Sequence, residues 1–265
     1  MNGPKRIICM TEETVETLYL LGEQDRVAGI SGFTVRPPEA RKEKPKVSAF
    51  TSAKIPKILD LKPDLVLGFS DLQADIAAEL IKHGIEVYVF NHRTVDGILQ
   101  MIRTLGRLVD AADKADALAD SYKLKIENIK KETSQWNVKP GVYFEEWYDP
   151  IISGIGWVSE LIEIAGGVDV YAENAKHQGA KDRIIANPLE VVGKAPDIII
   201  GSWCGKRFHP HKVAERNGWK DVPAVLNENI YEIKSPLILQ PGPAALTDGL
   251  DQIFKITKDW YLNHE

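Results

Sequence analysis

Short apolar runs alternate with amphipathic stretches along most of the chain. The apolar runs have strand length, carry no polar face and are bounded by Gly, Pro or Asp, which predicts buried strands. The predicted strands are residues 6–10, 27–31, 64–69, 86–90, 141–147, 197–202 and 230–233. The stretches between them have helical periodicity or helix-capping residues; they are 11–22, 52–61, 72–83, 95–109, 158–165, 188–194, 212–217 (a single turn) and 243–261. This alternation predicts an α/β protein whose mainly parallel sheets are covered by helices on both faces.

Two segments depart from the alternation. Residues 34–46 are polar and Pro-rich, and without either period they predict a long surface loop. Residues 111–135 contain neither Gly nor Pro and predict one long helix. At 1.5 Å per residue such a helix would be about 37 Å long. Its predicted buried stripe is Ala112, Ala115, Leu118, Tyr122, Ile126 and Ile129.

The two sides of the long helix resemble each other. Pro63-Asp64 precedes an apolar strand that ends in Gly, and Pro196-Asp197 does the same in the second half. A helix ended by Gly also occurs in each half, at 15–22 and at 159–166. We therefore expect two Rossmann-like lobes, 1–110 and 136–265, joined by the helix 111–135. The alternative is that Pro-Asp before a buried strand is simply common in α/β proteins.

Composition narrows the function. The formal charge of −5 comes from mixed signs without a basic stripe, which argues against a nucleic-acid partner. No apolar run approaches the roughly 18 residues of a membrane span, so we expect no membrane insertion. The start of the chain has no signal peptide, which predicts a cytoplasmic protein as the sequence stands and a periplasmic one if an export signal has been removed. Cys9 and Cys204 are too few for a disulfide framework and are expected to be free thiols.

Residues that follow the strands are the candidate ligand contacts, because ligands of open α/β sheets lie beyond the carboxyl ends of the strands. Three tryptophans at or near strand ends predict a cleft for a large, planar, partly apolar ligand, although each could instead pack between helices and sheet. Glutamate and glutamine side chains nearby would orient it. The predicted ligand-binding residues are Phe50, Phe69, Glu145, Glu146, Trp147, Trp157, Trp203, Cys204 and Gln240.

Metal binding and catalysis find less support. His209-Pro210-His211 near Cys204 is no zinc signature, and the neighbouring carboxylates Glu145 and Glu146 should point to opposite faces of their strand, so no metal site is predicted. The chain lacks a nucleophile elbow, a Walker loop and a dinucleotide fingerprint. We expect a protein that is not an enzyme. The alternative is an enzyme using Cys204, whose thiol pKa nearby basic residues could lower.

The order of elements, together with several short motifs, resembles the class III substrate-binding proteins of ABC transporters, the group that binds vitamin B12, ferric siderophores and haem. The resemblance covers nearly the whole chain. The motifs are VSAF at 47–50, ILDLKPDLV at 58–66, GIEV at 84–87, and SG at 153–154 leading into ELIEIAGG at 160–167. Within that group the chain is most similar to the cobalamin-binding branch, in which aromatic residues at the positions of Phe50 and Phe69 face the corrin ring.

This resemblance implies a non-catalytic two-lobe protein with cobalamin or a related corrinoid as its small-molecule ligand. Trp203 and Trp157 would be the counterparts of Phe50 and Phe69 in the second lobe, and an ABC permease is the implied partner. A ferric siderophore or haem as ligand is the alternative. A sensor whose cleft is filled by its own side chains is a third reading.

The chain also departs from the family pattern. The surface glutamates that dock such proteins on a permease are not reproduced, and Gln73 and Gly218 stand at the nearest positions. The apolar, Pro-rich segment 235–243 replaces a charged cleft segment. A binder of a corrinoid or another metal chelate therefore stays open without a transporter. A single joining helix predicts a small rocking motion on binding.

Overall fold

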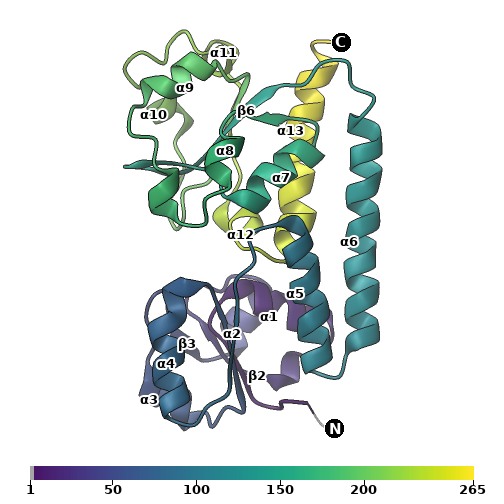
Figure 1. The fold of residues 1–265 in the computed structure, drawn as a ribbon, viewed down its shortest axis with the longest axis vertical. Helices are drawn as coiled ribbons and strands as arrows, with labels where there is room; N and C mark the ends of the chain where they lie inside the picture. The colour runs from purple at the N-terminus through teal and green to yellow at the C-terminus, as the bar shows by residue number, and fades with distance from the viewer. Residues whose placement is uncertain (1–2) are drawn as a thin grey trace. The chain divides into compact units, whose positions relative to one another are not determined.

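The chain forms two compact units. A computed structural model describes residues 3–265, and within it residues 3–92 and 96–122 form the N-terminal unit, while 93–95 and 123–265 form the C-terminal unit (Figure 1). Helix α6 (Ala112–Thr133) contributes residues to both. The long helix predicted at 111–135 therefore occurs, with bounds that differ by at most two residues at each end.

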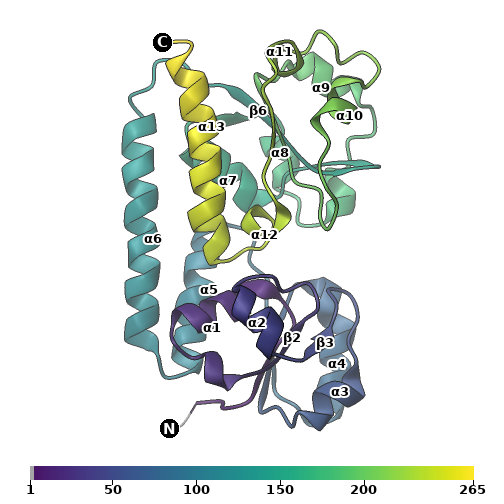
Figure 2. The same ribbon diagram turned by 180° about the vertical axis from the view of Figure 1, so that it is seen from behind.

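The N-terminal unit contains a five-stranded parallel sheet in the order β3-β2-β1-β4-β5. The strands are β1 (Ile7–Cys9), β2 (Val27–Ser31), β3 (Lys46–Ser48), β4 (Leu65–Phe69) and β5 (Val87–Phe90). The helical segments are α1 (Glu12–Leu20), η1 (Gln24–Arg26), α2 (Pro38–Glu43), α3 (Ile55–Asp60), η2 (Asp71–Gln73), α4 (Ala74–Lys82) and α5 (Val95–Leu108). Helix α4 is nearer the viewer in Figure 1, and α1 and α2 are nearer in Figure 2, so helices cover both faces of the sheet.

Burial explains why these short segments form strands. All residues of β1 and β4 are buried, which leaves parallel pairing under a double layer of helices as the way to satisfy their backbone. The strand order reverses direction between β1 and β4, and the carboxyl ends of these two strands form the switch point of the sheet. A buried cluster packs on the sheet and consists of Ile8, Met10, Val47, Ile58, Val66 and Leu80.

The C-terminal unit contains a second five-stranded sheet, in the order β10-β9-β6-β7, with β8 also paired to β6. Its strands are β6 (Gly141–Tyr148), β7 (Ile151–Ser153), β8 (Val168–Asp169), β9 (Ile198–Gly201) and β10 (Ile230–Glu232). All pairs are parallel except β6 with β7, a hairpin that turns through the cis Asp149-Pro150 bond. The helical segments are α7 (Gly156–Ile164), α8 (Ala172–Ala175), η3 (Ala180–Arg183), α9 (Leu189–Lys194), α10 (Pro210–Ala214), α11 (Pro223–Leu226), α12 (Ser235–Ile238), η4 (Ala245–Gly249) and α13 (Leu250–Leu262).

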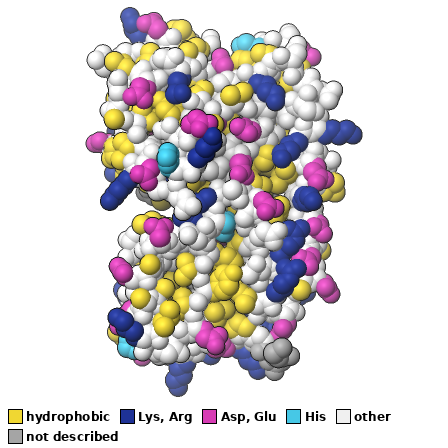
Figure 3. All heavy atoms as spheres, viewed as in Figure 1, with side chains coloured by type: hydrophobic (Ala, Val, Ile, Leu, Met, Phe, Trp, Pro, Cys, Tyr) yellow, Lys and Arg dark blue, Asp and Glu magenta, His cyan; other side chains and the backbone are white. Residues whose placement is uncertain are grey.

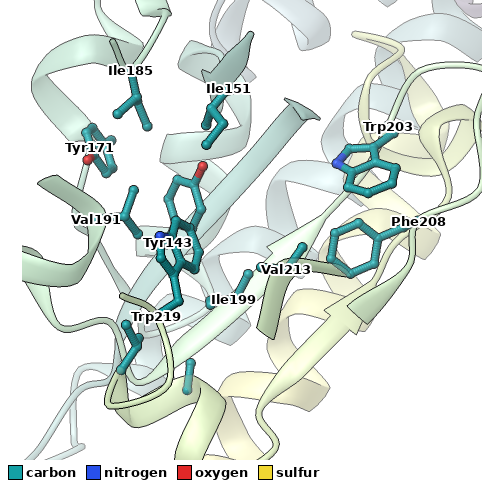
Figure 4. Packing of buried hydrophobic residues seen from close by; sticks show 12 residues of the cluster. Tyr143, Ile151, Tyr171, Ile185, Val191, Ile199, Trp203, Phe208, Val213 and Trp219 are labelled. Carbon is teal, nitrogen blue, oxygen red and sulfur yellow. The ribbon is translucent and has the colours of Figure 1, made fainter. Parts of the chain in front are cut away.

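Aromatic side chains dominate the core of the C-terminal unit. Tyr143 on β6 contacts Trp219 at a ring distance of 6.0 Å and Tyr171 at 5.6 Å. Figure 4 shows these rings together with Trp203 and Phe208, which lie side by side with centroids 4.9 Å apart. Large rings supply much buried area from few residues, which suits a sheet with short strands.

Helix α6 buries one narrow stripe. Ala115, Ala119, Tyr122, Ile126 and Ile129 are buried, at steps of three and four residues. Leu118 and Ala112, which the sequence also assigned to the stripe, are only half-buried at its edges. After α6, the Trp136 ring stacks on Tyr261 of α13 with centroids 4.6 Å apart.

All seven strands predicted from the alternating pattern occur in nearly the predicted places, and they are seven of the ten strands in the described residues. The loop predicted for 34–46 is wrong, because α2 (Pro38–Glu43) starts on a proline in its first turn and β3 begins at Lys46. The helix predicted for 52–61 begins later, at Ile55, and the turn predicted for 212–217 is α10 at Pro210–Ala214. Strands β7 and β8 were missed because each is too short to show a period.

Gly201 makes room for Phe208 and provides a test of this packing. A Cβ at Gly201 would lie 1.8 Å from the buried Phe208 ring, so Gly201→Ala should lower the free energy of unfolding by about 1–3 kcal/mol. A Cβ at Gly193 in α9 would meet nothing within 4 Å, and Gly193→Ala should be neutral or stabilising by up to about 1 kcal/mol. Urea denaturation of both variants checks this. Equal stability of the two would contradict the packing described.

Candidate functional site

Three parallel strands of the C-terminal unit end at one edge of their sheet. β6 ends at Tyr148, β9 at Gly201 and β10 at Glu232, and β9 pairs in parallel with both of the others. In open α/β sheets the residues that follow such ends bind ligands. The segments that follow these strands line two neighbouring pockets.

The two pockets have volumes of about 430 and 400 Å³ and share the side chains of Trp203, Lys206 and Arg207. The first is also lined by Gly205, Glu232, Ile233, Lys234, Ser235 and Pro236. The second is also lined by Tyr148, His209, Lys212 and Arg216. Together they form a site with an aromatic wall and many cationic side chains. Of the predicted ligand-binding residues, Trp203 lines both pockets.

Trp203 is held in a defined orientation. Its indole N–H donates to Glu145 Oε1 at 3.0 Å, and its ring contacts Phe208 edge to face and Tyr148 in a tilted arrangement, with the Tyr148 centroid at 4.6 Å. The side chain is almost fully buried. Fixed rings of this kind lose little conformational entropy when a ligand stacks on them.

Glu145 is the buried centre of this arrangement. Its carboxylate has no exposed surface and accepts hydrogen bonds from Trp203, from the Tyr143 hydroxyl at 3.0 Å and from Arg216, whose Nη2 lies 2.8 Å from Oε1. Burial, and then the Glu145 charge, raise the pKa of Tyr143 well above its usual range. Glu145 thus positions Trp203 and Arg216 within the protein, and the direct ligand contact predicted for it stays a prediction.

Glu146 points to the other face of β6, as the sequence predicted. It pairs with Arg183, with Nη1 2.6 Å from Oε2 and Nη2 3.3 Å from Oε1. Arg183 is almost completely buried and also donates to the Ser153 carbonyl. Glu146 therefore ties β6 and β7 to η3, and it too is engaged within the protein.

Lys206 lies against the aromatic wall. Its ammonium donates to the Tyr148 hydroxyl at 2.7 Å and lies 5.2 and 5.0 Å from the ring centroids of Trp147 and Tyr148. Cation–π contacts of this kind hold a lysine in place. The indole N–H of Trp147 is directed elsewhere, to the Asp149 carbonyl at 2.9 Å.

A cationic rim surrounds the pockets. It consists of Lys206, Arg207, Lys212 and Lys234. Among residues 3–265, none of the four forms an ion pair with a carboxylate. Partial burial, followed by Lys212, His211 and Arg207, lowers the pKa of His209, as expected in a region of positive potential. Among the residues that line the pockets, Lys212, Arg216 and Lys234 were not singled out from the sequence.

Two other predicted residues of this unit lie outside the pocket linings. Trp157 of α7 is buried, and its indole N–H donates to the Ile238 carbonyl at 2.8 Å, which fixes α12. Gln240 is half-buried in the turn after α12, where its carbonyl accepts from the Gly242 N–H at 2.8 Å. In this structure Trp157 acts as a core residue that supports the segment 235–238.

The N-terminal unit brings Phe50 and Phe69 together through one side chain. Gln73 donates to the Phe50 carbonyl at 2.9 Å and accepts from the Phe69 N–H at 3.0 Å. The Phe69 ring packs edge to face on His92 at 5.3 Å. Gln73 and Gly218, which stand nearest to the positions of the family's docking glutamates, differ in exposure, because Gln73 is fully buried and Gly218 is exposed.

The surroundings of Cys9 and Cys204 raise the pKa of both thiols, so neither is activated as a nucleophile. Cys204 is exposed, yet desolvation of its sulfur and the nearby Glu146 raise its pKa. Burial raises the pKa of Cys9 to about 12. Neither thiol therefore has the lowered pKa that the cysteine-enzyme alternative requires. The His209 and His211 rings are 5.5 Å apart, and no group of three or more His, Cys, Asp or Glu side chains suited to a metal occurs within 3–265.

Buried carboxylates also follow β1 in the N-terminal unit. Glu12 accepts from the backbone N–H groups of Val35 and of Arg36, the latter at 3.1 Å, and Glu13 accepts from the Thr11 hydroxyl. Burial outweighs these hydrogen bonds and raises the pKa of Glu12 and of Glu13 to about 7. Both acids lie in the first turn of α1, inside the helix predicted at 11–22.

This elevation predicts an unusual pH dependence of stability. A carboxyl whose pKa is 4.5 unfolded and about 7 folded destabilises the fold as it ionises, so its cost appears between pH 4.5 and 7 and is complete above 7. The variant Glu12→Gln keeps an acceptor for Val35 and Arg36 but cannot ionise. Its stability advantage over the parent chain, measured by urea denaturation, should therefore grow across this range. An advantage that is constant with pH would contradict the raised pKa.

The Glu145–Arg216 pair gives a second test. Arg216→Met should lower the free energy of unfolding by about 3–5 kcal/mol, because it leaves a buried carboxylate without its cation. The double variant Glu145→Gln, Arg216→Met removes that charge and keeps an acceptor for Trp203, so it should regain part of the loss. Thermal and urea unfolding measure both. A double variant no more stable than the single one would show that the buried charge is not the cause.

The face of the molecule seen in Figure 1 carries both charged and apolar side chains. Figure 3 shows Lys and Arg interspersed with Asp and Glu, and hydrophobic side chains gathered on part of the N-terminal unit. Exposed large hydrophobic residues of that unit include Leu20, Phe33, Leu72 and Ile81. Within 3–265 no helix has both the length and the apolar character of a membrane span.

The chain is similar in sequence to bacterial substrate-binding proteins. An uncharacterised ABC transporter substrate-binding lipoprotein of Bacillus subtilis, YvrC, is 27% identical over 262 residues, covering 94% of this chain and 79% of the relative. A vitamin B12-binding protein of Vibrio campbellii is 24% identical over 253 residues, covering 92% and 87%.

Solved structures confirm the predicted fold class. The periplasmic vitamin B12-binding protein BtuF of Vibrio cholerae superposes with a TM-score of 0.77 at 22% identity, covering 98% of each chain. The periplasmic haem-binding protein RhuT of Roseiflexus superposes with a TM-score of 0.80 at 21% identity, covering 96% of this chain and 100% of that one. The model of the periplasmic binding protein family matches residues 7–237, and the chain belongs to this family of transporter-associated binding proteins.

Proposed function

We propose that the protein is a non-catalytic binding protein for a metal chelate with a large, planar organic ring, in the first place a cobalamin-like corrinoid, which it passes to an ABC permease. The observation that carries this proposal is the aromatic wall at the carboxyl edge of β6 and β9, where Trp203 and Tyr148 line a pocket of about 400 Å³. The likeness to vitamin B12-binding proteins over more than nine-tenths of the chain supports the corrin ring.

Stacking is the interaction that would select a ring ligand. Aromatic faces attract flat π-systems, and an ordered contact adds about 0.5–1.5 kcal/mol to the area that it buries. Trp203 is preoriented by Glu145, so its ring need not be ordered on binding. Phe50 and Phe69 of the N-terminal unit, whose backbone groups both bond to Gln73, stay proposed as ligand-binding residues of that unit.

Haem or a ferric siderophore is the second candidate ligand. It is supported by the haem-binding protein of the same fold, and by the fact that an aromatic wall recognises porphyrin and corrin faces alike. A cysteine-dependent enzyme receives less support, because the pKa of Cys204 is raised. The lipoprotein relative supports a place of action outside the cytoplasm, which fractionation of cells that express the native gene would test.

Titration tests the ligand. Cyanocobalamin, haem and ferric siderophores are added in turn to the protein, and binding is followed by the absorbance of the ligand and by tryptophan fluorescence. We expect saturable binding of a corrinoid. The proposed function is abandoned if none of these chelates changes the absorbance or fluorescence, or releases or absorbs heat in calorimetry.

Variants at Trp203 show whether binding occurs at the aromatic wall. Trp203→Leu should weaken binding about threefold to tenfold through lost stacking. Trp203→Phe keeps a ring and should retain most of the affinity. Thermal unfolding of both variants identifies any loss that is due to misfolding. Unchanged affinity in a folded Trp203→Leu variant would place the ligand elsewhere.

A further inference from the structure

The cationic rim exceeds what an uncharged ring requires. We propose, on the basis of the proposed function, that the ligand is a carboxylate-bearing form of the ring, an acid whose rim carboxylates contact the cationic rim of the pockets. An amidated ring with a neutral periphery would give these cations no carboxylate to pair with. The proposed carboxylates are on the periphery of the ligand and do not involve its metal.

The charge at this edge contrasts with the rest of the molecule. The chain has a net charge of −5, yet the cationic rim contributes four positive charges around two adjoining pockets. Glu232 also lines the first pocket and its Oε1 accepts from the Phe208 N–H at 3.2 Å, so four charges less one leave three. Arg216 is excluded from this sum because Glu145 neutralises it.

The rim also differs from a set of ordinary solvated lysines. The Lys206 ammonium is fixed between the Tyr148 hydroxyl and two aromatic faces, next to Trp203. Desolvation is the main cause of the lowered pKa of His209, and Lys212, His211 and Arg207 add to it against the opposing charge of Glu232, which agrees with a net positive potential beside the pockets. A carboxylate entering here would gain charge-assisted hydrogen bonds without breaking an ion pair of the rim among residues 3–265.

The aromatic wall and the rim together define the geometry of recognition. Trp203 lines both pockets, and the shared Lys206 and Arg207 lie between residues that line only one of them. A flat ring stacked on the wall would therefore have cations around part of its circumference. Carboxylates carried at the edge of a tetrapyrrole ring would be within reach of these cations.

Two probes that share one ring and its axial ligands test the inference. Dicyanocobyrinic acid has rim carboxylates, whereas dicyanocobinamide has amides on the same ring. Cyanocobalamin, which adds a nucleotide loop with a phosphodiester and an axial base to the amidated ring, is the third probe. We expect dicyanocobyrinic acid to bind at least about tenfold more tightly than dicyanocobinamide at low ionic strength. That advantage should shrink at high salt, which screens partly exposed charges. If cyanocobalamin gains affinity over dicyanocobinamide and dicyanocobyrinic acid does not, the site recognises the nucleotide loop, and the carboxylate assignment is overturned.

Lysine variants locate the effect. Lys212 and Lys234 are both exposed, so the double variant Lys212→Gln, Lys234→Gln should remain folded. It should lower the affinity for dicyanocobyrinic acid about tenfold and leave that for dicyanocobinamide nearly unchanged. Lys220→Gln is the matched control, because Lys220 is exposed in the same unit but lines neither pocket. An equal loss from the control would mean a general charge effect and overturn the role of the rim.

The outcomes separate this inference from the proposed function. Equal, salt-independent affinity for the acid and the amide would overturn the inference and leave a ring-binding protein. Tight binding of haem, whose propionates are also carboxylates, with the same dependence on salt and on the two lysines would support the inference on a different ring. If no probe binds, charged or uncharged, both proposals fail.

Discussion

Parallel pairing of short, fully buried strands is the constraint on which the rest of the structure depends. Strands such as β4 and β9 carry apolar residues on both faces, so they are stable only inside a sheet that helices cover on both sides. Every parallel strand of a sheet then ends at the same edge. The residues after those ends gather whether or not they are close in sequence, which is how Tyr148, Trp203 and Lys234 come to line adjoining pockets.

Within that frame a buried charge fixes the site. Glu145 is on the central strand β6, and a carboxylate without exposed surface costs several kcal/mol unless it is paired and hydrogen-bonded. Arg216, Tyr143 and Trp203 meet this requirement from three separate segments. The need to satisfy one carboxylate thus sets the orientation of the indole at the pocket wall.

Features that depend on neighbouring residues could be predicted from the sequence, whereas features that depend on residues far apart in the chain could not. Seven strands and the long helix α6 could be predicted, because hydrophobic periodicity is a local property that the fold preserves. Helix α2 was missed because its pattern is short and polar, and β7 because a three-residue strand shows no period. Trp203 was predicted as a site residue, but Arg216 was not, since its role comes from Glu145, which is 71 residues away. Partnerships of that kind are tertiary and leave no local pattern.

The two units show why a shared scaffold does not imply a shared site. Both have parallel strands with ligand-competent edges, yet the side chains at those edges differ in kind. In the N-terminal unit, β4 is followed by Gln73, which clamps the backbone of two phenylalanines, and β1 is followed by buried carboxylates whose pKa values are raised. In the C-terminal unit the corresponding edge has an aromatic wall and cations that form no ion pair among residues 3–265. Strand positions are fixed by packing, whereas residues just beyond them are free to vary, so the chemistry of binding is determined by the loops and not by the fold.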